Sequence, residues 1–500
     1  MLIAVEGCAH GELDNIYASL AVVEERHGCK VDVLLICGDF QAVRNAADLA
    51  GMACPPKYRA MQSFYKYYTG EKVAPVLTIF IGGNHEASAH LCELCYGGWA
   101  APNIFYLGSA GVVNVGGVRI GGLSGIYKSN HYHQGHHERP PFSEDEMRSC
   151  YHIRETDVFR LRQLRKPMDV FLSHDWPQHI AKHGDTHGLV RRKPFLQSEI
   201  ADGSLGSPPA AQILHTLRPS YWFSAHLHVK FAATVMHAAK ATAEATAATD
   251  AAAAAPAVAV TKFLSLGKCT SHGDFLQIVE VDGDGSASPP ALSYDAEWLA
   301  VLRSTAHLET AARGRVDLGA AAIAAASAGR CDFTPTAEEE AEVVARGEES
   351  LHVPLDFAIT APAYVPGQNI VDAQAAFTEH PQTTRFVDTF GLPADFRTRR
   401  GATHQGGGGG GGDGGGGSGG GGSGSAGYGM AMPPPPSRPS MQLPEPVSSS
   451  FPPQPFRADP AGYGYDPNKA AKTSAPAHTM GLLNAVHVPP LDEEIDLDDD

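Results

Sequence analysis

The chain has 500 residues, a mass of 52.8 kDa and a formal net charge of −17. All of the acidic excess lies after residue 230, because residues 1–230 hold 22 basic and 22 acidic side chains. The charge therefore does not exclude a nucleic-acid partner for this part, whereas the lack of 18 consecutive uncharged apolar residues excludes a membrane-spanning segment.

The N-terminal residues and the cysteines predict the compartment. The sequence MLIAVEGCAHGELD has no basic stretch and reaches Glu6 early, which is not the pattern of a secretory signal. The nine cysteines are scattered, as is typical of reduced thiols rather than of a disulfide framework. We expect a chain of the cytosol or the nucleus.

Short apolar runs alternate with helical stretches from residue 1 to about residue 235. The runs are enriched in β-branched residues and are bounded by Gly, Asp, Asn or His, which is typical of buried strands. Because the first three are spaced as in βαβ units, we predict an α/β fold. The runs are Leu2–Val5, Val33–Cys37, Val76–Ile81, Val118–Leu123, Val170–Leu172 and Tyr221–Phe223.

An Ala-rich segment, residues 239–257, interrupts this pattern and reads as an expanded loop or a marginal surface helix. The predicted core then resumes and leads into a small, mostly helical extension. Its expected elements are strands at Thr261–Leu266 and Phe275–Val281, a strand or short helix at Tyr294–Leu302, and helices at Glu338–Val344 and Ala373–Glu379.

Residues 401–500 are rich in Gly and Pro and end with seven acidic residues among the last nine. Such a composition buries too little apolar surface to offset the entropy of the chain. We expect a disordered tail.

Side chains of types that can bind metals follow five of the predicted strands. The carboxyl ends of strands in an open α/β sheet are where ligands converge, so we expect these side chains to meet. Nitrogen and oxygen donors in this number suit a pair of borderline divalent ions such as Zn, Mn or Fe(II). The candidates are Cys8, His10, Asp39, Asn84, His85, His174, His226 and His228.

Four motifs carry a family resemblance: GDF from residue 38, GNHE from 83, SHDW from 173 and AHLH from 225. They resemble the signature of the calcineurin-like metallophosphoesterases, whose first motif is usually Asp-x-His where this chain has Cys8-Ala-His10. That departure, together with GGWAAPNI from residue 97 and YHIR from 151, resembles the branch of the family that debranches intron lariats. The resemblance covers residues 1 to about 237 and 261–302.

The resemblance implies a metallophosphoesterase-type β-sandwich flanked by helices, with a small C-terminal extension and the disordered tail. It also implies a division of the chain. The expected parts are a catalytic domain at 1–237 with a lariat-recognition loop at 127–158, an insertion at 238–257, a C-terminal domain of the debranching type at 258–400, and the tail at 401–500.

The resemblance implies two divalent ions, Fe²⁺, Zn²⁺ or Mn²⁺, that share Asp39. Cys8, His10, Asp39 and His228 would hold one ion, and Asp39, Asn84, His174 and His226 the other. A thiolate at position 8 would favour Zn or Fe(II) over Mg. Two interpretations of Cys8 remain open, a ligand or a small packing residue beside a single functional metal.

The implied reaction is metal-dependent hydrolysis of the 2′,5′-phosphodiester at the branch point of excised intron lariats. The metals would activate water and neutralise phosphate oxygens, while His85 would protonate the departing 2′ oxygen as general acid. The products would be a linear RNA with a 5′-phosphate and a free 2′-hydroxyl. The implied partners are branched lariat RNA and, through the tail, splicing or intron-turnover proteins, and the implied location is the nucleus.

The segment 127–154 is too long for a simple connection and is rich in His, Tyr and Arg. Because aromatic faces stack on unpaired bases and Arg contacts phosphate, we expect Tyr127, His152 and Arg154 to contact RNA. The histidines of this segment offer either a third metal site or a surface loop that tolerates His. Basic residues outnumber acidic ones ten to five between 148 and 193, which indicates either an RNA-binding or a solvated surface.

Two alternative functions are weighed against this one. A general metallophosphoesterase would keep the ligands without needing the long loop at 127–154, and a metal-free scaffold of the same fold would be expected to have lost ligands. Cys92-x-x-Cys95 has the spacing of a redox or zinc motif, but it lacks a second pair and is expected to be part of an ordinary helix.

Overall fold

The computed structural model of this chain describes residues 1–238, 259–271, 273–284, 290–319, 322–324, 327, 329–347, 350–367 and 379–392. The predicted insertion at 239–257, residues 373–378 of a predicted helix and the predicted disordered tail lie outside the described residues.

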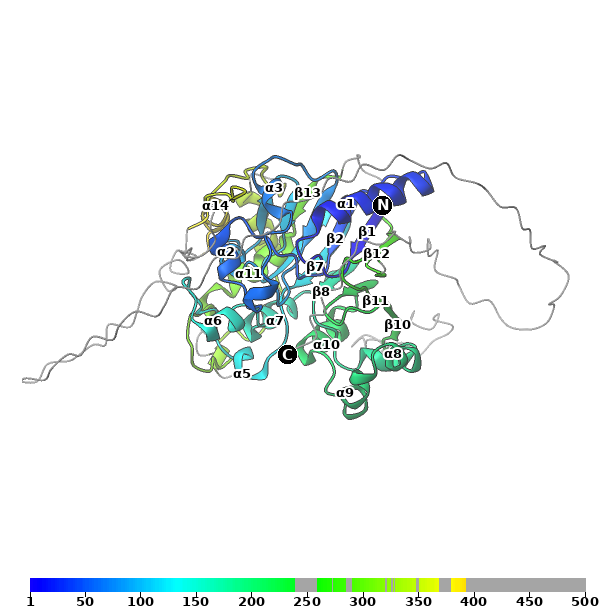
Figure 1. Ribbon diagram of the computed structural model, residues 1–500. Coiled ribbons are helices and arrows are strands. Elements are labelled where there is room, and N and C mark those ends of the chain that lie inside the picture. The colour runs from blue at the N-terminus through cyan, green and yellow to red at the C-terminus, as the bar shows by residue number, and fades with distance from the viewer. Residues whose placement is uncertain are drawn as a thin grey trace, which may run out of the picture. The chain divides into compact units, whose positions relative to one another are not determined.

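Two mixed β-sheets form the centre of the molecule (Figure 1). The six-stranded sheet has the order β12-β1-β2-β3-β5-β4, and its neighbours from β1 to β5 are parallel. Its strands are β1 (Leu2–Glu6), β2 (Val33–Ile36), β3 (Leu77–Phe80), β4 (Gly98–Ala101), β5 (Ile104–Tyr106) and β12 (Leu276–Glu280).

The seven-stranded sheet has the order β10-β11-β9-β8-β7-β6-β13, with β7, β8, β9 and β11 parallel. Its strands are β6 (Ala110–Val115), β7 (Val118–Leu123), β8 (Val170–Ser173), β9 (Tyr221–Ser224), β10 (Phe231–Met236), β11 (Val260–Ser265) and β13 (Leu292–Tyr294). β11, β12 and β13 follow the insertion, so residues beyond 258 complete both sheets, and the predicted domain division stays a prediction.

The two sheets pack face to face, with helices covering each outer face. In β1, Ile3 and Val5 point into the core between the sheets, whereas Ala4 belongs to the core beneath α1 (Leu13–His27) and α3 (Phe64–Tyr68). Helices α7 (Glu155–Leu161), α10 (Pro208–Leu217) and α11 (Ala296–Ser304) cover the outer face of the second sheet. Strands buried on both faces need the continuous apolar runs seen in the sequence. The predicted sandwich flanked by helices is confirmed.

The remaining helices lie in connections or in the C-terminal extension. None of the helices in the described residues has the length and apolar character needed to span a bilayer. Besides α1 and α3, the helices of the described residues are α2 (Ala46–Ala50), α4 (Ser88–Glu93), α5 (Ser129–Tyr132), α6 (Glu144–Ser149), α7 (Glu155–Leu161), α8 (Thr186–Arg192), α9 (Gln197–Asp202), α10 (Pro208–Leu217), α11 (Ala296–Ser304), α13 (Ala337–Arg346) and α14 (Pro381–Phe390), with 3₁₀ turns at Pro56–Tyr58, Ile180–His183, Pro194–Leu196 and Ala306–Leu308.

The predicted apolar segment Tyr294–Leu302 divides into two elements. Tyr294 ends β13, and the side chain of Asp295 accepts a hydrogen bond from the backbone N–H of Trp298, which caps α11. An aspartate at this position satisfies a backbone donor at the start of a helix, so the chain turns from strand to helix at Asp295.

Candidate metal centre

The predicted ligands meet where strands of both sheets end. Cys8 and His10 follow β1, Asp39 follows β2, and Asn84 follows β3 in the first sheet. In the second sheet, His174 follows β8, and His226 and His228 follow β9. The carboxyl ends of parallel strands thus bring together residues from five separate parts of the chain.

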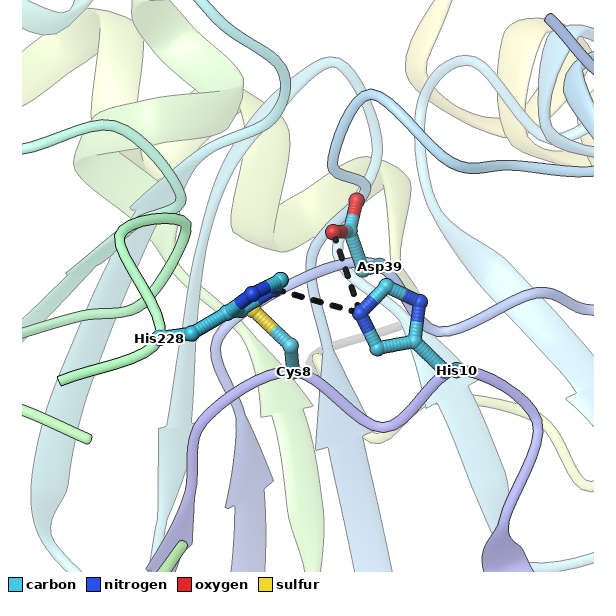
Figure 2. Close-up of side chains that lie close together, drawn as sticks. All are labelled: Cys8, His10, Asp39 and His228. Carbon is cyan, nitrogen blue, oxygen red and sulfur yellow. Dashed lines mark hydrogen bonds and ion pairs between the residues drawn. The ribbon is translucent and has the colours of Figure 1, made fainter. Parts of the chain in front are cut away.

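Four of these side chains form one compact cluster, shown in Figure 2. One donor atom each from Cys8, His10, Asp39 and His228 lies within 4.8 Å of the other three. Nε2 of His10 is 3.3 Å from Nε2 of His228 and 3.7 Å from Oδ2 of Asp39. One thiol, two imidazoles and one carboxylate fit a borderline divalent ion such as Zn²⁺ or Fe²⁺.

The second carboxylate oxygen of Asp39 faces a second group of donors. Its Oδ1 is 3.2 Å from Nε2 of His174, which is 3.1 Å from Oδ1 of Asn84. The ring of His226 lies beside that of His174, with 5.0 Å between the centroids. Asp39 therefore stands between two donor sets, and this placement is the one that a shared ligand requires.

Backbone strain is concentrated at these ligand positions. The φ angles of His10, Asp39, His226 and His228 are 44°, 46°, 65° and 46°. This left-handed region costs an L-residue about 1–2 kcal/mol, and such strain gathers at functional sites. The surrounding fold therefore holds these side chains in place against a local preference of the backbone.

Two glycines make room for the ligands. A Cβ atom at position 83 would lie 2.2 Å from Oδ1 of Asp39, and a Cβ at position 38 would lie 2.4 Å from Nδ1 of His174. Both distances are far shorter than a van der Waals contact, and Gly38 also has a φ of 107°. Gly83 is thus required by the close approach of its loop to Asp39, and Gly38 by the close approach of the His174 side chain.

Hydrogen bonds fix which ring nitrogen of two histidines faces the centre. Nδ1 of His174 lies 2.8 Å from the carbonyl oxygen of Cys37 and must carry a proton to donate to it. A neutral His174 ring held in this way presents an unprotonated Nε2 to the centre. Nδ1 of His10 lies 3.1 Å from the side-chain amide of Gln41, which leaves its Nε2 toward Asp39. Such outer contacts orient ligating histidines.

The electrostatics keep three of the histidine donors neutral, whereas the pKa of His174, which burial would lower, is raised by Asp39 and its other neighbours. Burial lowers the pKa values of His10, His226 and His228 to about 3, so these imidazoles are neutral at pH 7. Burial would raise the pKa of Asp39, but His174 and His85 hold it well below its usual value. Burial, followed by Asp39, raises the pKa of the Cys8 thiol, so ionisation of this thiol requires a cation.

His85, the predicted general acid, lies beside this cluster. Its ring centroid is 5.6 Å from that of His10. Burial would lower the pKa of His85, but Asp39, Cys54 and Glu86 together outweigh this and raise the pKa to about 9. The imidazole therefore carries an extra proton at neutral pH, as a general acid must.

Glu86 connects two loops of the site, a role that was not predicted from the sequence. Its buried carboxylate accepts hydrogen bonds from the backbone N–H groups of Phe40 and Gly83 with one oxygen, and from that of Gln41 with the other. Glu86 thus ties the loop that carries Asp39 to the loop that carries Asn84. The acidic residue that ends the GNHE motif was the available signal.

The three predicted RNA contacts differ in their exposure. Tyr127 is half-buried, its backbone N–H donates to Asp175, and its ring packs against Tyr132 with 5.5 Å between centroids. His152 is buried, and its Nδ1 lies 2.7 Å from Nδ1 of His131. Of the three residues, Tyr127 is the one that is not fully buried.

The expected RNA contact of Arg154 needs correction. Its side chain has no exposed surface, and its guanidinium donates to the Glu138 carboxylate at 2.5 Å and to the carbonyl oxygens of Gly135, Ser149 and His152. A guanidinium with no exposed surface, and with four of its five N–H donors bonded to protein acceptors, is not accessible to a phosphate. Arg154 therefore organises the loop from within.

The remaining histidines of the loop are paired with acids rather than with one another. His133 contacts Glu155 at 2.6 Å, and His136 contacts Asp157 at 2.8 Å. Within the described residues, these loop histidines form no compact cluster of three or more His, Cys, Asp or Glu side chains like the one at Cys8. Cys92 lies in α4 as expected, whereas Cys95 lies in the turn that follows this helix, contrary to the expectation for the pair.

Comparison with known proteins first defines the class of this fold and site. A family model described as calcineurin-like phosphoesterase matches residues 1–230, and one described as lariat debranching enzyme, C-terminal domain, matches residues 258–395. The chain thus belongs to the calcineurin-like phosphoesterases, which are hydrolases of phosphoester bonds.

Curated relatives then define the particular family. The chain is 52% identical to the lariat debranching enzyme of Danio rerio over 396 residues, 51% identical to that of Homo sapiens over 397, and 48% identical to that of Arabidopsis thaliana over 394. These matches cover 78–79% of this chain and 66%, 69% and 87% of the relatives. The chain is a member of the lariat debranching enzyme family, which confirms the resemblance seen in the sequence.

Proposed function

We propose that this chain hydrolyses the 2′,5′-phosphodiester at the branch point of intron lariats, giving a linear RNA with a 5′-phosphate and a free 2′-hydroxyl. The observation that carries the proposal is the position of Asp39, which faces His10 and His228 on one side and His174 on the other. Membership of the debranching family supports the substrate class.

Two sets of residues would hold the metal ions: Cys8, His10, Asp39 and His228 on one side, and Asp39, Asn84, His174 and His226 on the other. Divalent ions in such a pair lower the pKa of water and neutralise phosphate oxygens. The sulfur and nitrogen donors favour Fe²⁺ or Zn²⁺, and Mn²⁺ is also compatible with the nitrogen and oxygen donors.

The chain's own side chains supply the remaining chemistry. His85 holds a proton at the edge of the centre and would deliver it to the departing 2′ oxygen, a role worth about 10²–10⁴-fold in rate. Glu86 would hold the loop of Asp39 and the loop of Asn84 in fixed positions relative to each other during the reaction. Tyr127, at the start of the loop 127–158, would stack on an unpaired base near the branch.

The substrate also supports two proposals about the setting of the protein. Because intron lariats arise during splicing, the chain would act in the nucleus. The residues beyond 400, with 11 acidic and 4 basic side chains, would serve contacts with splicing or intron-turnover proteins.

The test compares three substrates with the full chain reconstituted separately with Fe²⁺, Zn²⁺ and Mn²⁺. We expect cleavage of a synthetic 2′,5′-branched RNA, with little cleavage of a linear 3′,5′ RNA or of p-nitrophenyl phosphate. Asp39→Asn, which keeps the shape but removes the shared charge, is the inactive control. Cleavage of the latter two substrates without the first would favour a general phosphoesterase, and no cleavage of any would favour the scaffold.

A further inference from the structure

We infer that the C-terminal extension is a brace for the metal centre, and that Arg44 is the positioning residue through which it acts. The brace consists of residues 353–364 together with α14. This inference rests on the proposed function. It concerns residues that lie away from the ligands but on the same two loops.

The loop that carries Asp39 and the loop that carries Asn84 and His85 are connected by two sets of hydrogen bonds. Glu86 makes the first connection, close to the ligands, through the backbone of residues 40, 41 and 83. Arg44 makes the second: its guanidinium donates to both oxygens of Glu93, at 2.7 and 3.0 Å, and also to Asp48. Arg44 lies five residues after Asp39, and Glu93 ends α4, which follows His85.

This second connection is shielded from water. The side chains of Arg44, Asp48 and Glu93 are 3%, 2% and 1% exposed. A buried fork of this kind has a defined geometry, since the planar guanidinium meets each carboxylate at fixed angles. It therefore fixes the separation of the two loops more sharply than a surface ion pair would.

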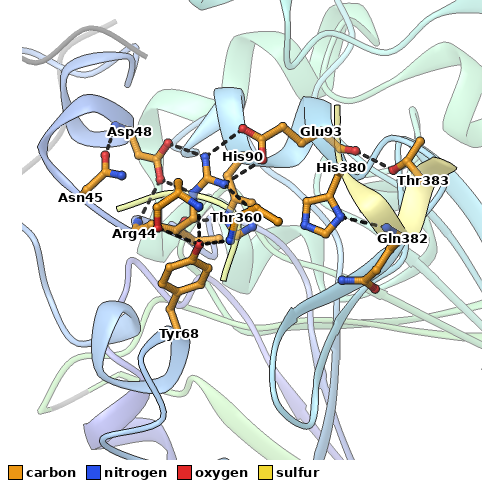
Figure 3. A network of polar contacts seen from close by, with 12 residues as sticks. Arg44, Asn45, Asp48, Tyr68, His90, Glu93, Thr360, His380, Gln382 and Thr383 are labelled. Atoms are coloured by element: carbon orange, nitrogen blue, oxygen red, sulfur yellow. Dashed lines mark hydrogen bonds and ion pairs between the residues drawn. The ribbon is translucent and has the colours of Figure 1, made fainter. Parts of the chain in front are cut away.

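The C-terminal extension holds both ends of the Arg44–Glu93 pair (Figure 3). At one end, the backbone N–H of Tyr364 donates to the carbonyl oxygen of Arg44 at 2.8 Å, and the Arg44 guanidinium is 3.5 Å from the Thr360 hydroxyl. At the other end, the Thr383 hydroxyl on α14 donates to the carbonyl oxygen of Glu93 at 2.6 Å. Segments more than 260 residues away in sequence thus contact both Arg44, which follows the Asp39 loop, and Glu93, which follows the Asn84–His85 loop.

Further contacts anchor the brace to the first sheet and its helices. The buried Tyr68 hydroxyl accepts hydrogen bonds from the backbone N–H groups of Thr360 and Ala361. The side-chain amide of Gln382 pairs with both the N–H and the carbonyl of Trp99 in β4, at 2.7 and 2.9 Å. The extension is therefore fixed on both sides of the pair and can transmit its position to the loops.

The consequence is a defined role for the extension in turnover rather than in substrate affinity. A displacement of about 1 Å in catalytic groups costs up to about 10²-fold in rate. Loss of the brace would let the Asp39 loop move relative to the Asn84–His85 loop. The shared ligand and the general acid would then be misplaced, while the RNA-binding surface of the loop 127–158 would stay intact.

The experiment uses two variants of the full chain and two matched controls. Arg44→Lys keeps the charge but removes the fork, and Thr383→Val removes one hydroxyl with little change in shape. Arg119→Lys disrupts an equally buried fork to Asp295 and Glu297, between β7 and α11. Thr389→Val makes the same change elsewhere on α14.

Two readouts separate positioning from general stability. In the metal-free protein, amide exchange at residues 40–43 and 83–86 should become about five- to tenfold faster in Arg44→Lys and Thr383→Val, with no change in the controls. In the reconstituted enzyme, kcat on branched RNA should fall about 10–100-fold in Arg44→Lys, with KM within about twofold.

Equal effects of Arg44→Lys and Arg119→Lys on exchange at these residues would overturn the brace. If Arg44→Lys does not fold, Thr383→Val against Thr389→Val decides the matter, and equal exchange in that pair would overturn it as well. A chain that lacks debranching activity yet shows the predicted exchange would reject the proposed function and keep the brace.

Discussion

The backbone N–H of His85 donates a 2.8 Å hydrogen bond to Oδ1 of Asp39. The same carboxylate contributes most among the neighbours that offset burial, and together with Cys54 and Glu86 it raises the pKa of the His85 imidazole to about 9. One side chain thus contributes to both the position and the charge of the proposed general acid, while it also faces both donor sets. We therefore expect the protonation of His85 to depend on occupancy of the metal centre.

The first prediction concerns His85. Replacing it with Ala removes the proton donor but none of the predicted ligands, so turnover of branched RNA should fall about 10²–10⁴-fold. Metal content per chain, measured by elemental analysis, should stay the same. His27→Ala, at an exposed position at the end of α1, is the control. Unchanged turnover in His85→Ala would remove the assignment.

The second prediction concerns Cys8. Because its sulfur lies in the four-donor cluster, Cys8→Ala should weaken one of the two metal sites, and Cys8→Asp should shift the preference from Fe²⁺ or Zn²⁺ toward the harder Mn²⁺. The measurement is metal stoichiometry after anaerobic purification, followed by activity with each ion. Cys29→Ser serves as control. Full occupancy in Cys8→Ala would show that Cys8 is a packing residue.

The third prediction concerns Arg154, whose guanidinium is fully buried inside the loop. Arg154→Met leaves Glu138 buried without its partner, a change that costs about 3–5 kcal/mol and should loosen the loop. KM for branched RNA should rise, but the slope of log KM against log salt should stay constant. The double variant with Glu138→Gln should recover part of the stability. A direct phosphate contact would instead lower that slope by about 1.

The fourth prediction concerns pH. Burial, then His131 and Arg154, lower the pKa of His152 to about 3, below the value of about 6.5 expected in the unfolded chain. Between these values the unfolded chain binds a proton that the folded chain does not, so the free energy of unfolding falls as the pH drops below 6.5. Denaturant unfolding at pH 7, 6 and 5 should show a smaller fall in the free energy of unfolding for His152→Gln than for the wild-type chain. His27→Gln should show the original slope, and an equal fall in His152→Gln would contradict the assignment.

Local sequence predicted the strands that carry the ligands because each is a continuous apolar run followed at once by a polar motif. Strands β4, β5 and β6 were missed, since their residues are small or mixed in character and their pairing depends on distant partners. Strand β10 alternates buried and exposed residues and was missed for the lack of an apolar run.

The site residues also divide into those that local sequence predicts and those that depend on distant contacts. The donors beside strand ends meet as expected, since strand geometry alone brings them to one edge. The burial of Arg154 and the function of Glu86 depend on contacts between segments that no local pattern reports. The brace is a stronger case, because its partners are separated by about 300 residues.

The left-handed backbone at His10, Asp39, His226 and His228 has a consequence for selection in the laboratory. Glycine is the residue most at ease in that conformation, so a glycine at any of these positions would relieve strain while deleting a ligand. A screen that rewards heat resistance of the metal-free chain would therefore enrich inactive proteins. Improved variants of this chain should be selected with metal present and turnover as the criterion.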